Sequence, residues 1–136
     1  MTIAVATVLS DQLLEMFTHA TTAASHHRGG REMLTAILDN EEPESFLRRA
    51  IARNQVWTSQ VGDDLSGFVV CRDGVIETVY VSKEFRRRGV ATQLVRAIID
   101  ASPEQLDAYA LPGDRATKSF FESLGWKARL LTMRGA

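Results

Sequence analysis

The sequence predicts an α/β fold of the α+β kind, with a mixed, mostly antiparallel central sheet and helices on both faces. A β-rich stretch over residues 56–82 is interrupted by turn signals, which is typical of an antiparallel meander. Helical apolar spacing then alternates with short strand-like runs up to residue 133. Together these patterns predict the order β-α-α-β-β-β-α-β-α-β, because a meander followed by strand–helix alternation gives a mixed sheet covered by helices.

The N-terminal part is predicted to hold one strand and then helices. A β-branched run at 3–8 favours a first strand, and Ser10 is suited to cap the helix that follows it. Residues 25–30 break the pattern and read as a loop. A helical stripe resumes at 33–38, and Pro43 is suited to the first turn of a further helix.

Three strands are predicted next, at 56–61, 65–71 and 75–82. The second and third are joined by Asp73-Gly74. Both residue types tolerate the positive φ of a type I′ turn, so this pair predicts a tight hairpin.

The C-terminal part is predicted to alternate. A helix over 89–101 is followed by a strand at 106–111. Asp114 is suited to cap a last helix, and Gly125 to end it in the left-handed conformation. Residues 126–133 are predicted as a final strand.

Composition indicates one globular domain over residues 1–136. Hydrophobic residues make up 45% and charged residues 24%, and a net charge of −1 provides no general attraction to nucleic acid or an anionic membrane. Cys71 is the only cysteine, which excludes an internal disulfide and fits a reducing compartment; we interpret it as a small buried hydrophobe. No segment approaches the ~20 apolar residues of a membrane span. We therefore expect a cytoplasmic protein.

The chemically informative stretch runs from Val79 to Ala91. Here a strand enters a basic loop, Arg86-Arg87-Arg88, and the loop enters a helix whose first turn contains the small residues Gly89 and Ala91. The first amides of a helix lack internal partners and lie at the positive end of its dipole. Small side chains let phosphate oxygens approach these amides, so the stretch predicts an anion site.

This stretch resembles the signature of the GNAT superfamily of acetyltransferases, Arg/Gln-x-x-Gly-x-Gly/Ala, matched by Arg86, Gly89 and Ala91. The later segment 119–126 is similar to the Phe-Tyr-x-x-x-Gly-Phe close of that family. The resemblance covers residues 55–133. It implies an acetyl-CoA-dependent N-acetyltransferase that needs no metal.

The resemblance also implies particular binding residues. The pantetheine arm would pair with the strand backbone and the pyrophosphate would lie on the amides of the loop and helix start, with a ring of the last helix beside them. The residues that these roles fall on are Val79, Tyr80, Val81, Arg86, Arg87, Arg88, Gly89, Val90, Ala91, Thr92 and Phe121.

Catalytic groups are implied on the same strand. Glu77, Val79 and Val81 are alternate residues of the predicted strand, so we expect their side chains on one face of the sheet. Glu77 is the candidate general base. A backbone carbonyl with a water is the alternative. A strand amide near Val79 is the candidate oxyanion donor.

One position departs from the family. Phe121 stands where the family usually has the tyrosine that protonates the leaving thiolate. Water or Tyr109 would then supply the proton, or the domain is a coenzyme-binding regulatory module with little catalysis. Asp114, where the family often has asparagine, is more simply explained as a helix cap.

The expected partners are acetyl-CoA and a primary amine of a small molecule or a peptide, with no nucleic acid and no membrane. The chain is expected to be a monomer or a homodimer in which residues 126–133 contribute to the contact. His26 and His27 lack the companions of a metal site, so we expect no metal. An enzyme acting on aminoacyl-tRNA is disfavoured, because the near-neutral charge offers no broad basic face.

Overall fold

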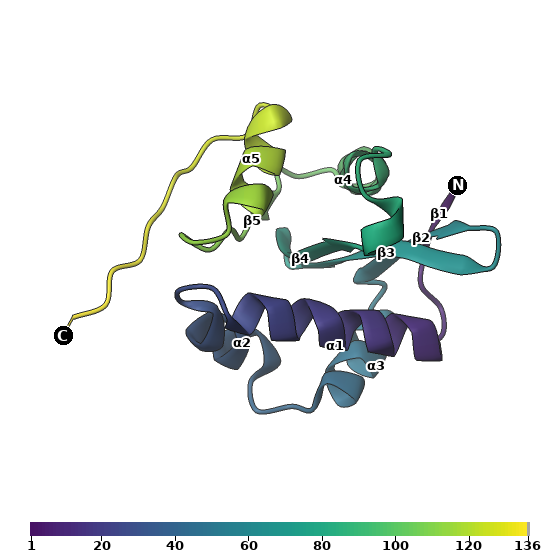
Figure 1. Ribbon diagram of the computed structural model, residues 1–136, viewed down its shortest axis with the longest axis horizontal. Helices are drawn as coiled ribbons and strands as arrows, with labels where there is room; N and C mark the ends of the chain where they lie inside the picture. The colour runs from purple at the N-terminus through teal and green to yellow at the C-terminus, as the bar shows by residue number, and fades with distance from the viewer. Residues whose placement is uncertain (136) are drawn as a thin grey trace.

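A computed structural model describes residues 1–135. Figure 1 shows the elements in chain order. They are β1 (Thr2–Val5), α1 (Asp11–Ser25), α2 (Gly30–Leu38), α3 (Pro43–Ala52), β2 (Val56–Val61), β3 (Asp64–Arg72), β4 (Val75–Val81), the 3₁₀ turn η1 (Lys83–Phe85), α4 (Val90–Ala101), β5 (Asp107–Ala108) and α5 (Arg115–Ser123).

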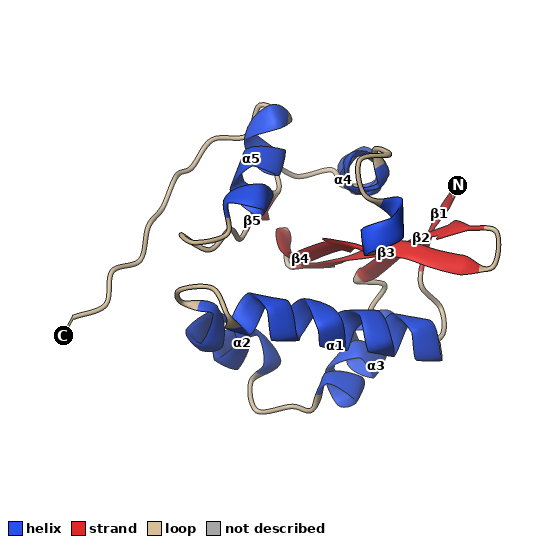
Figure 2. Ribbon diagram, viewed as in Figure 1, coloured by secondary structure: helices blue, strands red, loops and turns tan. Residues whose placement is uncertain are grey.

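The sheet has the order β1-β2-β3-β4-β5. Each of the first four strands pairs antiparallel with the next, and β5 pairs parallel with β4. Helices α1, α2 and α3 cover one face, and α4 and α5 cover the other (Figure 2). This confirms the predicted mixed, mostly antiparallel sheet with helices on both faces.

Two apolar clusters hold these layers together, one on each face of the sheet. On the α1–α3 face, Phe17 stacks on Phe46 and also contacts Phe68 of β3. On the α4–α5 face, Val69 and Ile76 of the sheet are buried with residues of the two helices. The α4–α5 cluster contains Val69, Ile76, Val90, Leu94, Val95, Ile98 and Phe121 as its buried members.

Local signals placed several boundaries correctly. The Ser10 side chain accepts a hydrogen bond from the Leu13 amide, and Asp114 accepts one from Thr117. Pro43 lies in the first turn of α3. Asp73 and Gly74 have φ of 51° and 79°, as the tight hairpin requires.

The structure corrects three predictions about the elements. The helical stripe predicted at 33–38 is confirmed as α2, so three helices lie between β1 and β2 where the predicted element order has two. β5 is shorter than the predicted strand at 106–111.

The last correction concerns residues 126–133, which do not form a strand. Beyond Trp126 the chain leaves α5 and extends away from the sheet (Figure 1). Leu130 and Leu131 are both exposed, and they lie on opposite faces of an extended chain. The alternation expected of a half-buried strand is therefore absent.

Within residues 1–135, no helix has the length and apolar character needed to cross a membrane.

Candidate active site

The loop between η1 and α4 places backbone N–H groups at the start of a helix. Arg87 has a φ of 64° and Gly89, the N-cap of α4, has a φ of 76°. A non-glycine residue in the left-handed region costs roughly 1–2 kcal/mol, and such strain is often found at functional sites. A Cβ added at Gly89 would meet nothing within 4 Å, so the space above these amides is open.

The start of α4 differs from those of the other described helices. The α4 N-cap makes no side-chain hydrogen bond, and no acidic residue lies in the first turn. Each of the other four α-helices in residues 1–135 has a side-chain cap, an acidic residue in its first turn, or both. Both the amides and the positive end of the α4 dipole are therefore available to an anion.

The edge of β4 next to this loop is also open. β5 pairs only with Val75 and Ile76, and one further bond joins the Tyr109 amide to the Ile76 carbonyl at 3.0 Å. Within residues 1–135, the later part of β4 has no strand on this side.

The pattern of hydrogen bonds between β4 and β3 shows which backbone groups of β4 have no partner in the sheet. The Ser82 amide donates to Ser66 of β3, and alternate residues of an antiparallel pair exchange hydrogen bonds. Tyr80 and Thr78 therefore bond to β3, while the backbone groups of Val79 and Val81 point to the open edge. In agreement, the Val81 carbonyl accepts a hydrogen bond from Arg86 Nε at 3.0 Å.

Glu77 does not share a face with Val79 and Val81, and this expectation was wrong. Val70 pairs with Thr78 and Cys71 pairs with Ile76, which leaves Glu77 as the extra residue of a β-bulge. A bulge adds one residue to one strand and reverses the parity before it.

The Glu77 carboxylate is bound on both oxygens by Arg72. Arg72 Nε donates to Oε1 at 2.6 Å and Nη2 donates to Oε2 at 3.0 Å, and the Glu77 side chain is only 8% exposed. Arg72 also donates to the Ile37 carbonyl of α2 and lies 4.7 Å from the ring centroid of Phe46 in α3. The hydrogen bond that Arg72 donates to Glu77 raises the pKa of the Arg72 guanidinium. Arg72 thus joins the sheet to the α2–α3 layer, and Glu77 holds it in place.

Phe121 lies in the α4–α5 cluster. The residue is only 6% exposed, and its ring centroid lies 4.9 Å from that of Phe120 and 4.8 Å from that of Trp126. Val79 and Val81 pack against the same cluster. The structure therefore brings Phe121 to the same face of β4 as these two side chains.

Tyr80 points to the opposite face, where it packs against Phe68 and lines a cavity of about 630 Å³. The rest of the lining comes from α1 and its C-cap, and five of these six residues are of polar types: Glu15, Thr18, His19, Thr22, Ala23 and His26. Of these, sequence reasoning singled out only His26. The others occupy the polar face of an amphipathic helix and carry no signal that distinguishes them from a solvated surface.

Tyr109 and His27 lie outside this cavity. Tyr109 is 47% exposed at the end of β5, beside the point where β4 and β5 separate. His27 lies near Gly113, in the loop before α5. Within residues 1–135, no group of three or more His, Cys, Asp or Glu side chains is arranged to hold a metal ion.

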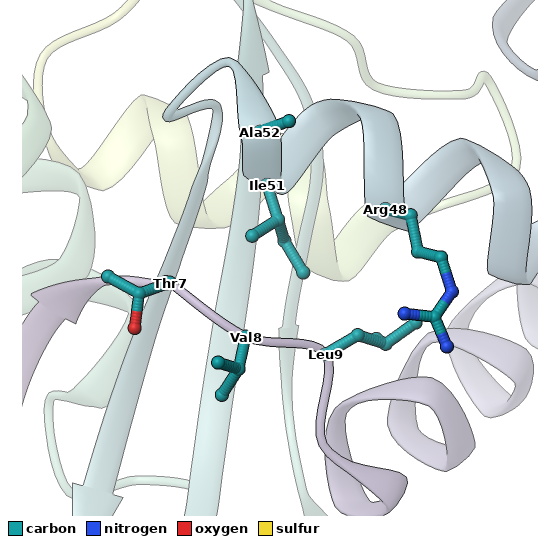
Figure 3. Close-up of a pocket in the computed structure, with 6 residues that line it drawn as sticks. All are labelled: Thr7, Val8, Leu9, Arg48, Ile51 and Ala52. Atoms are coloured by element: carbon teal, nitrogen blue, oxygen red, sulfur yellow. The ribbon is translucent and has the colours of Figure 1, made fainter.

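A second cavity, of about 380 Å³, lies elsewhere, between the β1–α1 connection and α3 (Figure 3). Val8, Leu9 and Ile51 give it an apolar lining, and its Arg48 is paired with Glu44 at 2.8 Å. None of the candidate residues reaches it.

Comparisons with known proteins identify the family of this chain. The chain matches the model of the acetyltransferase (GNAT) family over residues 11–126. An uncharacterized N-acetyltransferase of Escherichia coli, YafP, is 27% identical over 128 residues, which are 92% of this chain and 81% of the relative.

Solved structures share the fold. A tetramutant of the BH1408 protein from Bacillus halodurans has a TM-score of 0.67 at 16% identity, covering 100% of this chain and 99% of that one. The PaiA N-acetyltransferase of Thermoplasma acidophilum, in complex with coenzyme A, has a TM-score of 0.57 at 15% identity, covering 95% and 92%. Aminoglycoside N-acetyltransferase AAC(6')-Iy in complex with CoA has a TM-score of 0.55 at 17% identity, covering 82% and 89%.

The family match spans most of the chain and includes β4, the basic loop, α4 and α5, which carry the candidate residues. The chain belongs to the acetyltransferase (GNAT) family.

Proposed function

We propose that this protein is an acetyl-CoA-dependent N-acetyltransferase that transfers the acetyl group directly to a primary amine of a small molecule or a peptide. The proposal rests on one observation: two sets of backbone groups that are available to a ligand follow each other directly along the chain. The open edge of β4 leads through one basic loop to the uncapped start of α4.

The residues at this site fit the coenzyme. The amides of residues 87–92 would hold the diphosphate, and Arg86, Arg87 and Arg88 add positive charge beside it. The free N–H and C=O groups of Val79 and the free N–H of Val81 would hold the amides of the pantetheine arm in the manner of an added strand. The CoA complexes among proteins of the same fold support this assignment.

The acceptor amine would enter from the other face. The cavity beneath Tyr80 lies on the α1 side of β4, whereas the α4 start lies on the opposite side. The open edge of β4 connects the two faces. Glu15, His19 and His26 make the cavity suitable for a polar acceptor.

Transfer would proceed by attack of the neutral amine on the thioester carbonyl carbon. The Val79 amide would donate to the developing oxyanion, and the C–S bond would break as the acetyl group moves to nitrogen. Both Glu77 oxygens bind Arg72, so Glu77 would accept the amine proton through a bridging water. The alternative is that a backbone carbonyl and a water accept this proton. The thiolate would be protonated by Tyr109 or by water, because Phe121 has no proton to give.

Calorimetry with CoA, followed by a thiol-release assay with acetyl-CoA and a panel of primary amines, tests the proposal. We expect saturable CoA binding and turnover above the rate without amine. Failure to bind CoA would overturn the site assignment, and binding without turnover on a broad panel would overturn the enzymatic assignment alone.

The burial of Phe121 between Phe120 and Trp126 favours a second candidate function, a CoA-binding module without catalysis. Phe121→Tyr separates the two. If the lost hydroxyl limits the reaction, the variant gains turnover at least about a hundredfold, the lower end of the range for general acid catalysis. If the wild type is already fast and the variant unchanged, the missing hydroxyl is irrelevant.

A further inference from the structure

Gly67 lies in the middle of β3, against the first turn of α4. A Cβ built on this residue would lie 3.2 Å from Val90 Cγ1 and 3.4 Å from Leu94 Cδ1, and both of these side chains are buried. Gly67 does not have a positive φ, so its backbone conformation is open to residues with a side chain. The position therefore favours glycine for its lack of a side chain, because α4 approaches the sheet closely here.

A side chain at this position would also disturb the backbone of β4. The same Cβ would lie 2.8 Å from the Tyr80 carbonyl oxygen, so either this oxygen or β3 would have to move. The Tyr80 carbonyl shares one planar peptide unit with the Val81 N–H, which points to the open edge. A displacement of the Tyr80 oxygen therefore changes the direction in which the Val81 N–H points.

Gly67 thus adjoins both sets of backbone groups that would bind the coenzyme. On the helix side, the Gln93 amide donates to the Gly89 carbonyl at 3.0 Å, so the amides of residues 90–92 precede the first backbone bond of α4. Val90 carries the first of these amides, and its side chain packs on Gly67. On the strand side, Gly67 pairs with Val81. The space at Gly67 therefore fixes how far the helix amides lie from the open edge of β4.

We propose that Gly67 is a positioning residue for the coenzyme. Its missing side chain lets the first turn of α4 lie at the depth at which the helix amides and the Val81 N–H bind one CoA molecule together. Gly67 is buried under α4 and acts through these neighbours. A glycine inside a strand lowers stability, and the close approach that it permits here accounts for its presence. The inference rests on the proposed function, because it concerns how that site holds CoA.

The first test compares CoA binding and stability in Gly67→Ala, by calorimetry and urea denaturation. We expect the dissociation constant for CoA to rise at least about tenfold, because a misplacement of ~1 Å in a preorganised site can cost about a hundredfold. The KM for acetyl-CoA should rise by a similar factor while kcat changes less, since Gly67 touches no reacting group.

Val56→Ala is the matched control for a general loss of stability. Val56 is buried in β2 within the α1–α3 cluster, so its truncation lowers stability away from the coenzyme site and should leave CoA affinity unchanged. A wild type that does not bind CoA overturns the proposed function and this inference with it. If the wild type binds CoA and Gly67→Ala binds it equally well, or if Val56→Ala loses as much affinity, the inference alone is wrong.

The second test uses Val90, the helix residue that packs on Gly67. Val90→Ala removes the atom that the added Cβ would meet, so the affinity lost through Gly67→Ala should be at least about threefold smaller in the Val90→Ala background. Equal losses in the two backgrounds would show that the depth of α4 is not what Gly67 controls. Should Gly67→Ala not fold, Val90→Ile takes its place, since it extends the Cγ1 atom that faces Gly67 and should also weaken CoA binding. A folded Val90→Ile with wild-type affinity would then overturn the inference.

Discussion

The two halves of β4 use their polar groups in opposite ways. The first half, around Ile76 and Glu77, is closed: it pairs with β3 and β5, and its carboxylate is bound on both oxygens by Arg72. The second half, Val79 to Val81, is paired on one side only, and it leads to a helix start with no cap.

This contrast shows where binding capacity resides in the fold. The charged side chain that looks catalytic is paired with Arg72, which joins the layers, whereas the groups available to a ligand belong to the backbone. Buried polar groups need partners, so free backbone groups in a structured region mark a place where a ligand can supply them.

The strongest way to break the closed half is Glu77→Gln. It leaves the largely buried Arg72 without its counter-charge, so the free energy of unfolding should fall by about 3 kcal/mol. Urea denaturation measures this. The double variant Arg72→Met/Glu77→Leu is the control and should recover much of the loss, because no charge is then left buried.

The same variant examines Glu77 as a base. If Glu77→Gln keeps its stability but loses turnover at temperatures where it is folded, the carboxylate acts in chemistry and the joining role is wrong. If stability falls and folded protein retains turnover, the proton goes elsewhere.

The open half is best tested by Ala91→Asp. A carboxylate in the first turn of α4 competes with the diphosphate for the same amides, so the dissociation constant for CoA should rise at least tenfold, or about 1.4 kcal/mol. The helix itself should not be weakened, since an acid there gains about 0.3–1 kcal/mol from the dipole. Calorimetry and thermal unfolding measure the two effects. Ser45→Asp places the same charge in the first turn of α3, on the other face, and should leave CoA affinity unchanged.

A smaller effect is expected from Arg86→Ala. Arg86 is exposed, and its Nε binds the Val81 carbonyl, so its loss should weaken CoA binding about fivefold, or ~1 kcal/mol, with little change in stability. Arg88→Ala removes an equal charge from the same loop, where Arg88 lies over Phe85 instead. Equal losses in the two variants would mean that charge alone matters and the contact with β4 does not.

Much of the fold could be predicted because its signals are local. Ser10 and Asp114 cap helices through their own side chains, and Asp73-Gly74 adopts the φ values of its turn, so three-to-four residues determine each outcome. The basic loop and Gly89 were predictable for the same reason.

The parts that could not be predicted depend on distant partners. The bulge at Glu77 has no sequence signature, and a shift of one residue reverses the face of every side chain before it. The cavity at Tyr80 exists because α1 crosses the sheet there. Residues 126–133 include strand-forming types, yet a strand also needs pairing with a partner strand, and no such pairing forms here.

The smallest effect expected is on Cys71, which lies on β3 opposite Ile76 in the closed half of β4. Burial, and secondarily the charge of Glu77, raises the pKa of this thiol above its ordinary value. Since the thiolate is the reactive form, a raised pKa means less thiolate at any given pH. The reaction with an aromatic disulfide reagent should therefore be slower in the folded protein than in urea at pH 8, and its rate should continue to rise with pH after that of the unfolded chain has levelled off. Rates that level off at the same pH in both states would mean that this half of the strand is open to water.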